Sequence, residues 1–167
     1  MALHKLHALA IISLMDILII DDEPTHRLML QKMAESYGYN VTTAQNGEEG
    51  LFYLKRPDAD KYALVVTDLY MPVMGGRQLI QELRQIHPNI PAIVVTSESS
   101  DAIADELKVI GAQDFFVKPL SKARFKIGID NALQLSILKR EVERLHWCEQ
   151  GGFGFDDLIG AYSGLAD

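Results

Sequence analysis

The stretch MDILIIDDEP, residues 15–24, decides the fold class of this chain. Four consecutive apolar residues, three of them β-branched, are followed at once by three acidic residues and a proline. An unbroken apolar run of this kind is typical of a strand that is buried on both faces of a parallel sheet. Pro24 suits the first turn of a helix, so the stretch predicts a strand that passes directly into a helix.

Four further short runs follow along the chain, at residues 41–44, 63–66, 92–95 and 115–117, and most of them are continuously apolar. The segments between them carry apolar residues at helical spacing. These residues are Leu30, Met33, Ala34 and Tyr37, then Leu79, Ile80, Leu83 and Ile86, then Ile103, Ala104, Leu107 and Ile110. The alternation predicts an α/β fold, a doubly wound five-stranded parallel sheet with right-handed crossovers.

Residues that favour helix ends stand where this alternation requires them. Gly38 and Gly111 occupy positions where a left-handed residue closes a helix. Asn46 followed by Glu49 predicts an N-cap with its capping-box partner, and Ser121 is placed to cap the last helix.

Composition excludes several classes of protein. The chain has 167 residues, of which 48% are hydrophobic and 23% charged, as in an ordinary globular protein of roughly one domain. Its net charge of −7 argues against nucleic-acid binding, which needs clustered Lys and Arg. The single cysteine, Cys148, excludes an internal disulfide and a Cys-rich zinc site, and it fits a reducing cytoplasm.

The pattern divides the chain into four parts. We interpret residues 1–14 as an N-terminal tail, with a short docked helix as the alternative, because polar residues interrupt their apolar run before the length of a membrane span. Residues 15–135 form the predicted domain. Residues 136–150 form a helical linker, and residues 151–167 form a further linker or the edge of something missing.

The last helical segment is unusually long, since only Gly128 interrupts it between Ser121 and Gly151. Apolar residues follow coiled-coil spacing for two heptads, at Leu135, Leu138, Val142 and Leu145. Two heptads suit a coiled coil and an overhanging solvated helix equally well, so both alternatives stay open.

Polar residues fall where the predicted strands end. The first strand is followed by Asp21, Asp22 and Glu23, the third by Asp68, the fourth by Thr96 and Ser97, and the fifth by Lys118 and Pro119. Each residue alone has a structural explanation, as a helix cap, a strand former or a turn. Because the carboxyl ends of parallel strands meet at one edge of the sheet, we expect these side chains to share a site there.

Three carboxylates in one crevice need a counter-charge. At a separation of about 4 Å, two like charges repel by roughly 4 kcal/mol at an effective dielectric of 20. Either a proton is taken up or a cation resides among Asp21, Asp22 and Asp68, and all-oxygen ligands suit Mg²⁺. A carboxylate beside Mg²⁺ is able to attack a phosphoryl group, with Lys118 and Thr96 stabilising the charge. The five histidines fall in the tail, at helix ends or on the last helix, and we interpret them as non-catalytic.

The segments ILIIDDEP, VTDLYMPVMGG, VVTS and GAQDFFVKPL, in this order, resemble the motifs of bacterial response-regulator receiver domains. The resemblance covers about residues 15–135. It implies a flavodoxin-like (βα)5 fold with strand order 2-1-3-4-5 and an extended C-terminal helix. It also implies a two-component phosphorelay switch, not an enzyme beyond its own phosphorylation and dephosphorylation, that takes a phosphoryl group from a sensor histidine kinase.

The resemblance carries roles over to individual residues. Asp68 is the expected phosphoacceptor and a Mg²⁺ ligand, Asp22 a direct ligand, Asp21 the residue that orients a metal-bound water, and the backbone carbonyl of Tyr70 a further ligand.

The expected switch residues are Thr96, whose hydroxyl moves to the phosphoryl group, Lys118, which pairs with that group, and Phe115, the switch aromatic. Pro119 matches a proline that often follows a cis peptide bond.

Some positions depart from the family pattern. Gly75-Gly76 stands where Asp or Asn and then Gly are usual, which suggests a looser turn, and Phe115 lacks the hydroxyl of the frequent Tyr. Tyr70 and Glu98 occupy the two positions that tune water access to the acyl phosphate. The bulk of Tyr70 predicts slow self-dephosphorylation.

Beyond the domain, LKREVERL followed by GFGFDDLIGA is similar to the junction between receivers and the ATPase domain of sigma-54-dependent activators of the nitrogen-regulatory type. This similarity implies a transcription regulator that dimerises through the C-terminal helix, with residues 151–167 as the edge of a missing ATPase domain and output domains outside this sequence. The alternative is a stand-alone receiver that docks onto a partner.

Two other classes are disfavoured by single positions. A Mg²⁺-dependent aspartyl-phosphate phosphatase needs a second Asp two residues after the nucleophile, where Tyr70 stands. A flavin-binding redox domain needs a Ser/Thr-rich phosphate loop after the first strand, where the chain has Asp21, Asp22 and Glu23.

Overall fold

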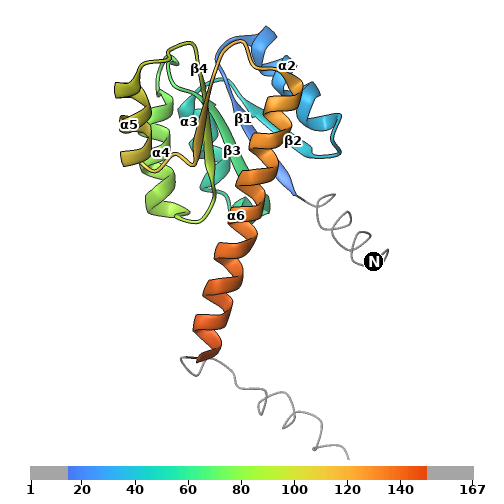
Figure 1. Cartoon of the computed structure of the whole chain (residues 1–167), viewed down its shortest axis with the longest axis vertical. Helices are drawn as coiled ribbons and strands as arrows, with labels where there is room; N and C mark the ends of the chain where they lie inside the picture. The colour runs from blue at the N-terminus through green and yellow to red at the C-terminus, as the bar shows by residue number, and fades with distance from the viewer. Residues whose placement is uncertain (1–14, 150–167) are drawn as a thin grey trace, which may run out of the picture. The chain divides into compact units, whose positions relative to one another are not determined.

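Five parallel strands form one sheet in the order β2-β1-β3-β4-β5, as predicted (Figure 1). This computed structural model describes residues 15–149. The strands are β1 (Asp16–Ile20), β2 (Asn40–Ala44), β3 (Tyr62–Asp68), β4 (Ala92–Thr96) and β5 (Asp114–Val117). The helices are α2 (Pro24–Glu35), α3 (Gly47–Leu54), α4 (Gly76–Ile86), α5 (Asp101–Val109) and α6 (Lys122–Glu149), and a 3₁₀ turn η1 spans Ala59–Lys61.

The sheet is covered on both faces, because successive side chains of each central strand point to opposite sides. In β1, Leu18 and Ile20 pack with residues of α3, α4 and α5, whereas Ile17 and Ile19 pack with residues of α2 and α6. Figure 1 shows α3, α4 and α5 on one side of the sheet and α2 with the first part of α6 on the other. Burial on both faces explains why these runs read as continuously apolar.

The edge of the sheet departs from this pattern. Residues 41–43 of β2 are only partly buried, because β2 has a neighbour on one side alone. Ile86 shares the helical spacing of Leu79, Ile80 and Leu83, but its side chain, at the end of α4, is 36% exposed. The remaining predicted face of α4, Leu79, Ile80 and Leu83, is fully buried.

The predicted helix ends are confirmed with one difference in detail. The Asn46 side chain accepts a hydrogen bond from the Glu49 amide at 2.9 Å, but the Glu49 carboxylate accepts from the amide of Gln45 at 2.8 Å. Gly38 and Gly111 have φ values of 90° and 95°. The Arg124 amide donates to the Ser121 hydroxyl at 3.2 Å.

Helix α6 crosses the boundary between two units of the chain, Met1–Ser136 and Ile137–Asp167. In the first unit the helix buries Phe125, Ile129, Ala132 and Leu133 against the sheet. In the second unit every described side chain, over residues 137–148, is exposed. The assignments of residues 1–14 and 151–167 lie outside the described residues, and the domain boundaries stay predictions. Over the described part of the chain, no helix is both long enough and apolar enough to cross a bilayer.

Candidate functional site

Three carboxylates converge at the carboxyl edge of the sheet. Asp21 and Asp22 directly follow β1, and Asp68 is the last residue of β3, the strand next to β1. One oxygen from each lies within 4.8 Å of the others. Asp21 is fully buried, Asp68 is 9% exposed and Asp22 is exposed. An all-oxygen donor set that is open to solvent on one side fits Mg²⁺, which retains several water ligands.

The side chain of Lys118 reaches this cluster from the end of β5. Its Nζ lies 2.7 Å from Oδ2 of Asp68 and 3.3 Å from Oδ2 of Asp21. Burial lowers the pKa of Lys118, but the hydrogen bond to Asp68 and the charges of both carboxylates outweigh it, so that its pKa is raised. The pocket therefore holds its own cation against two of the three carboxylates.

Asp21 is held by groups from its own strand-to-helix turn. Its Oδ1 accepts the Glu23 amide at 2.9 Å, and its Oδ2 contacts Nδ1 of His26. Burial raises the pKa of Asp21, but the hydrogen bonds from His26 and Glu23 and the charge of Lys118 outweigh it, so that its pKa is lowered. The Asp21 carboxylate is fixed in orientation and in charge.

The predicted switch residues lie in, or directly after, the two strands beyond β3. Thr96, the last residue of β4, is fully buried, and its hydroxyl oxygen accepts the Glu98 amide at 3.2 Å. The Thr96 carbonyl accepts the Lys118 amide at 2.8 Å, and the Lys118–Pro119 peptide is cis. Phe115 in β5 is partly buried against the core cluster that contains α5 residues.

Tyr70 and Glu98, the two predicted tuning positions, contact each other. The Tyr70 hydroxyl donates to the Glu98 carboxylate, and the Tyr70 amide donates to Oδ1 of Asp68 at 3.3 Å. Tyr70 and Glu98 each stand two residues beyond the end of a strand, β3 and β4 respectively. Their contact joins the two loops that leave the site at Asp68 and Thr96.

The turn from β3 into α4 is tighter than its sequence suggests. The Gly76 amide donates to the Leu69 carbonyl at 3.0 Å. A Cβ atom on Gly76 would lie 2.2 Å from the carbonyl oxygen of Asp68, and one on Gly75 would lie 2.9 Å from that of Leu69. The two glycines allow the backbone to close against the last residue of β3.

Residues 17–130 match the family model of the response regulator receiver domain. The chain belongs to this family. A receiver domain is a phosphoacceptor rather than a classical enzyme, and receiver domains have histidine kinases as partners. The acidic pocket formed by Asp21, Asp22 and Asp68 is typical of the Mg²⁺ site of receiver domains.

Several relatives share this receiver. The chain is 38% identical over 122 residues to the transcriptional regulatory protein GlrR of Escherichia coli, and the match covers 72% of this chain and 26% of that protein. It is 37% identical over 130 residues to the 3',5'-cyclic-nucleotide phosphodiesterase regA of Dictyostelium discoideum, over 76% of this chain and 16% of that protein. The chain therefore spans about a quarter or less of the length of these curated relatives, and only their receiver portion is compared.

Solved structures agree on the fold. The crystal structure of NtrX from Brucella abortus superposes with a TM-score of 0.72 and 29% identity, covering 78% of this chain and 29% of that one. A CheY-like receiver domain protein from Methanospirillum hungatei superposes with a TM-score of 0.70 and 25% identity, covering 75% of this chain and 98% of that one.

His26 is a residue of this receiver site that sequence reasoning missed. Its side chain is 10% exposed and contacts Asp21, and its Nε2 is buried without a hydrogen-bond partner. The spacing is the signal that points to it: His26 stands five residues after Asp21, in the first turn of α2, which folds back over the end of β1. Arg27 adds a hydrogen bond of 2.5 Å from the same turn to the Asp21 carbonyl.

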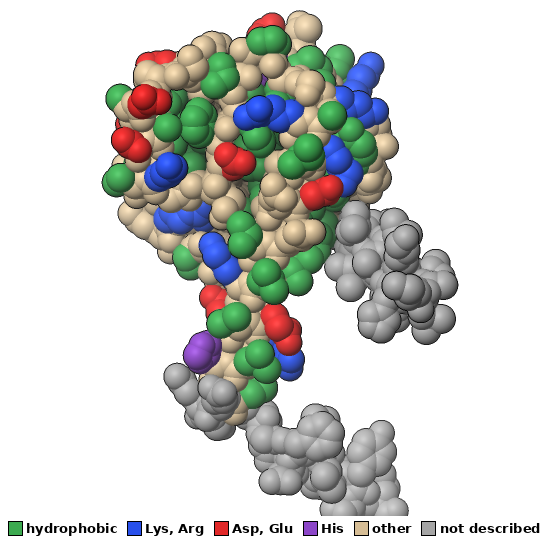
Figure 2. Space-filling model, in the orientation of Figure 1, with side chains coloured by type: hydrophobic (Ala, Val, Ile, Leu, Met, Phe, Trp, Pro, Cys, Tyr) green, Lys and Arg blue, Asp and Glu red, His purple; other side chains and the backbone are tan. Residues whose placement is uncertain are grey.

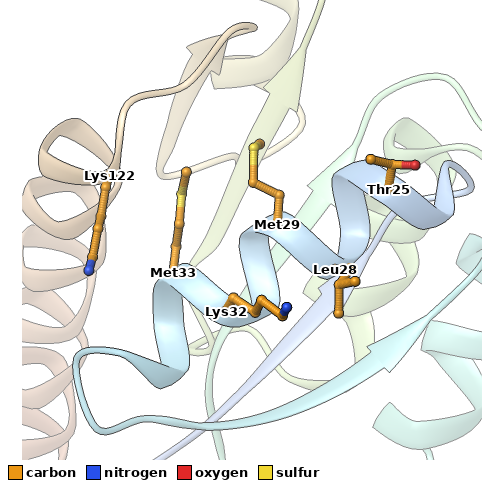
Figure 3. A pocket seen from close by; sticks show the side chains of 6 residues that line it. All are labelled: Thr25, Leu28, Met29, Lys32, Met33 and Lys122. Carbon is orange, nitrogen blue, oxygen red and sulfur yellow. The ribbon is translucent and has the colours of Figure 1, made fainter.

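A separate hollow of about 430 Å³ lies between α2 and the start of α6 (Figure 3). Its lining comes from Thr25, Leu28, Met29, Lys32, Met33 and Lys122. None of the three clustered carboxylates lines it, so it is not part of the acidic pocket of this receiver.

Proposed function

We propose that this receiver accepts a phosphoryl group on Asp68 from the phosphohistidine of a sensor histidine kinase. The observation that carries the proposal is the Lys118 ammonium group, 2.7 Å from Asp68 in a pocket that it shares with Asp21 and Asp22. A nucleophilic carboxylate with a fixed cation beside it and an all-oxygen metal site is what phosphoryl transfer requires.

In the transfer step, a carboxylate oxygen of Asp68 attacks phosphorus while the phosphorus–nitrogen bond of the phosphohistidine breaks. The electron pair of that bond stays on the imidazole. Lys118 holds positive charge beside the acceptor oxygen, and the Thr96 hydroxyl supplies a hydrogen-bond donor to the transferred group. Asp22, Asp68 and the Tyr70 carbonyl would hold Mg²⁺, with Asp21 orienting a water; the ion neutralises charge on the phosphoryl oxygens when it is bound.

The bound phosphoryl group then changes the surface of the domain. In this proposal the Thr96 hydroxyl turns toward the phosphoryl oxygens, which frees the space that Phe115 occupies on moving inward. Phe115 has no phenol, so its inward position is held by apolar packing alone. Tyr70 and Glu98 tune water access to the acyl phosphate.

For the output, we propose transcription regulation through a sigma-54-dependent activator. GlrR, a relative at 38% identity, is named a transcriptional regulatory protein. The junction motif supports the finer assignment through LKREVERL, which lies at the end of α6, and GFGFDDLIGA, which lies outside the described residues. The regA relative shows that a similar receiver also occurs in a phosphodiesterase, so docking of the receiver onto another partner is the second candidate.

We further propose that a second copy of the chain pairs with the C-terminal helix. Leu135, Leu138, Val142 and Leu145 follow coiled-coil spacing, and their side chains are between 39% and 61% exposed. Burying such a stripe against its own copy removes apolar surface from water, which favours a parallel or antiparallel helix pair.

The proposed compartment is the cytoplasm, where the histidine kinase domains that charge receivers reside and where a lone exposed Cys148 stays reduced. We expect no direct nucleic-acid or membrane binding by this chain. On the face that Figure 2 shows, basic and acidic side chains occupy the same regions rather than forming a single basic patch.

The decisive experiment compares wild type with Asp68→Asn. Incubated with acetyl phosphate and Mg²⁺, wild type should gain one phosphoryl group per chain that alkali and hydroxylamine remove, as expected of an acyl phosphate, and the variant should gain none. Sizing with beryllofluoride and Mg²⁺ should change the oligomeric state of wild type only. Equal labelling of both proteins would overturn the phosphoacceptor assignment, and multiple turnover of a phosphomonoester would favour the phosphatase class.

A further inference from the structure

The Tyr70 side chain is held from two directions although 52% of it is exposed. Its hydroxyl donates to Glu98. The guanidinium carbon of Arg77, in the first turn of α4, lies 5.2 Å from the centre of its ring, within the range of a cation–π contact. Nη2 of Arg77 is 3.5 Å from the Tyr70 hydroxyl oxygen. Arg77 therefore lies against the ring and reaches its polar end.

Arg77 is itself anchored to another helix. Its Nε and Nη2 donate to the two carboxylate oxygens of Glu106 in α5, at 2.5 and 3.1 Å. This two-point geometry fixes the plane of the guanidinium group, which a single contact would not do. The chain of contacts thus runs from the loop after Asp68, through Tyr70 and Arg77, to α5.

The ion pair itself contributes little to folding. The side chains of Arg77 and Glu106 are 33% and 40% exposed, and pairs with such access to solvent have small effects on stability. The main consequence of the pair is geometric: it limits the positions that the Arg77 guanidinium, and with it the Tyr70 ring, can take. A change at Arg77 is therefore separable from a change in stability.

We propose that Arg77 is a positioning residue that sets the lifetime of the phosphoryl group, by holding Tyr70 over the path of water to Asp68. The inference rests on the proposed function. In the step concerned, a water oxygen attacks phosphorus and the bond from phosphorus to the Asp68 oxygen breaks. The carboxylate leaves with the electron pair, and the water protons pass to the phosphate and the solvent. A Tyr70 ring that is free to rotate away exposes the phosphorus to that water.

The anchor on α5 extends the consequence beyond the site. Glu106 holds Arg77 only while α5 presents its carboxylate to α4. Any partner or movement that takes Glu106 away loosens Arg77, leaves Tyr70 held by Glu98 alone and shortens the phosphorylated state. The lifetime of the signal is then linked to the position of α5, although α5 contributes no residue to the acidic pocket.

The test measures how long the phosphorylated protein persists. Each variant is phosphorylated with acetyl phosphate and Mg²⁺, separated from the donor, and followed on a phosphate-affinity gel. Arg77→Gln and Glu106→Gln should each shorten the lifetime about two- to five-fold, the effect of one exposed cation–π contact. The double variant should have the same shortened lifetime as either single variant, because the two residues act as one unit. Arg77→Lys keeps the charge but not the two-point pair, so its lifetime should fall between wild type and Arg77→Gln.

Two controls separate positioning from charge and from folding. Arg56→Gln removes an exposed arginine paired with Asp58, ahead of β3 at the opposite edge of the sheet, and should leave the lifetime unchanged. In a Tyr70→Ala background, Arg77→Gln should have no further effect. A wild-type lifetime for Arg77→Gln, or the same loss with and without Tyr70, overturns the inference. Failure of wild type to become phosphorylated overturns the proposed function itself.

Discussion

Nζ of Lys118 lies 2.7 Å from Oδ2 of Asp68, although fifty residues separate the two in sequence. Lys118 directly follows β5 and Asp68 ends β3, and these two strands are not neighbours, since β4 lies between them. The contact exists because both strands end at the same edge and the lysine side chain is long enough to span the gap. It places one positive charge among the carboxylates of the pocket before any ion or phosphoryl group binds.

Replacing this lysine should destabilise the metal-free domain. In Lys118→Met, the carboxylates of Asp68 and Asp21 lose a charged hydrogen-bond donor, which costs about 1.5–3 kcal/mol of unfolding free energy. Urea unfolding in the presence of a chelator measures the change. Lys61→Met, which removes an exposed lysine paired with Asp58, is the matched control and should unfold like wild type. If both variants unfold at the same urea concentration, Lys118 does not compensate the negative charge of the pocket carboxylates.

The exposed carboxylate of Asp22 should dominate metal affinity. Saturating Mg²⁺ should raise the melting temperature of wild type, because a ligand at one hundred times its Kd stabilises by about 2.7 kcal/mol. Asp22→Asn should lose most of this increase, whereas Asp60→Asn, an exposed acid in η1, should keep it. Calorimetric titration with MgCl₂ checks the affinities directly. An unchanged Mg²⁺ response in Asp22→Asn would place the ion elsewhere.

Tyr39 should make the domain sensitive to alkali. Burial first, and then the charge of Asp130 and the hydrogen bond to it, raise the pKa of Tyr39 to about 12. The unfolded chain releases this proton near the ordinary pKa of about 10, so stability falls as pH rises from about 10 to about 12. Tyr39→Phe should remove this part of the pH dependence, and Asp130→Asn should lower the pKa of the phenol. Alkaline titration followed by phenolate absorbance tests both outcomes.

A single methyl group at Gly76 should disturb the phosphoacceptor strand. The added Cβ would lie 2.2 Å from the Asp68 carbonyl oxygen, so the backbone must shift, at a cost of about 1–3 kcal/mol. Gly76→Ala should lower both the unfolding free energy and the rate of phosphorylation by acetyl phosphate. Gly38→Asn is the control: nothing lies within 4 Å of the added Cβ, so only the positive φ of 90° strains the backbone, and this variant should lose some unfolding free energy but keep the wild-type rate of phosphorylation. A stable, fully active Gly76→Ala would mean that the turn is free to relax.

The sheet was predictable from sequence because its signal is local. Runs such as residues 17–20 contain only apolar residues, which indicates burial on both faces of the sheet. The residues at the carboxyl end of each strand are simply those that come next in the sequence. Parallel pairing then brings Asp21, Asp68 and Lys118 to one edge, so the sequence alone predicts the site. Ile86 shows where periodicity fails, since the last turn of α4 continues the pattern past the covered part of the helix.

The contacts that sequence reasoning missed depend on side-chain direction. Nothing in the spacing of Tyr70 and Glu98 says that the two side chains meet, nor that Arg77 lies against the Tyr70 ring and Glu106 against Arg77. The position of His26 at a helix end predicts no contact with the site, yet the turn between β1 and α2 directs its ring onto Asp21. Such contacts join different loops and helices, and the periods of two and 3.6 describe side-chain direction within one element only.

The position of Asp68 at the end of β3 has a consequence for motion. This strand is hydrogen-bonded to β1 and β4 on its two sides and is buried along its whole length. Backbone amides of such a strand exchange with deuterium only when the domain opens globally, while loop amides exchange through local fluctuations. The phosphoacceptor is therefore the stationary part of the site, and whatever rearranges on phosphorylation does so around it. Deuterium uptake near Asp68 should stay slow in both states, and the difference between the states should fall on the loops after β3 and β4.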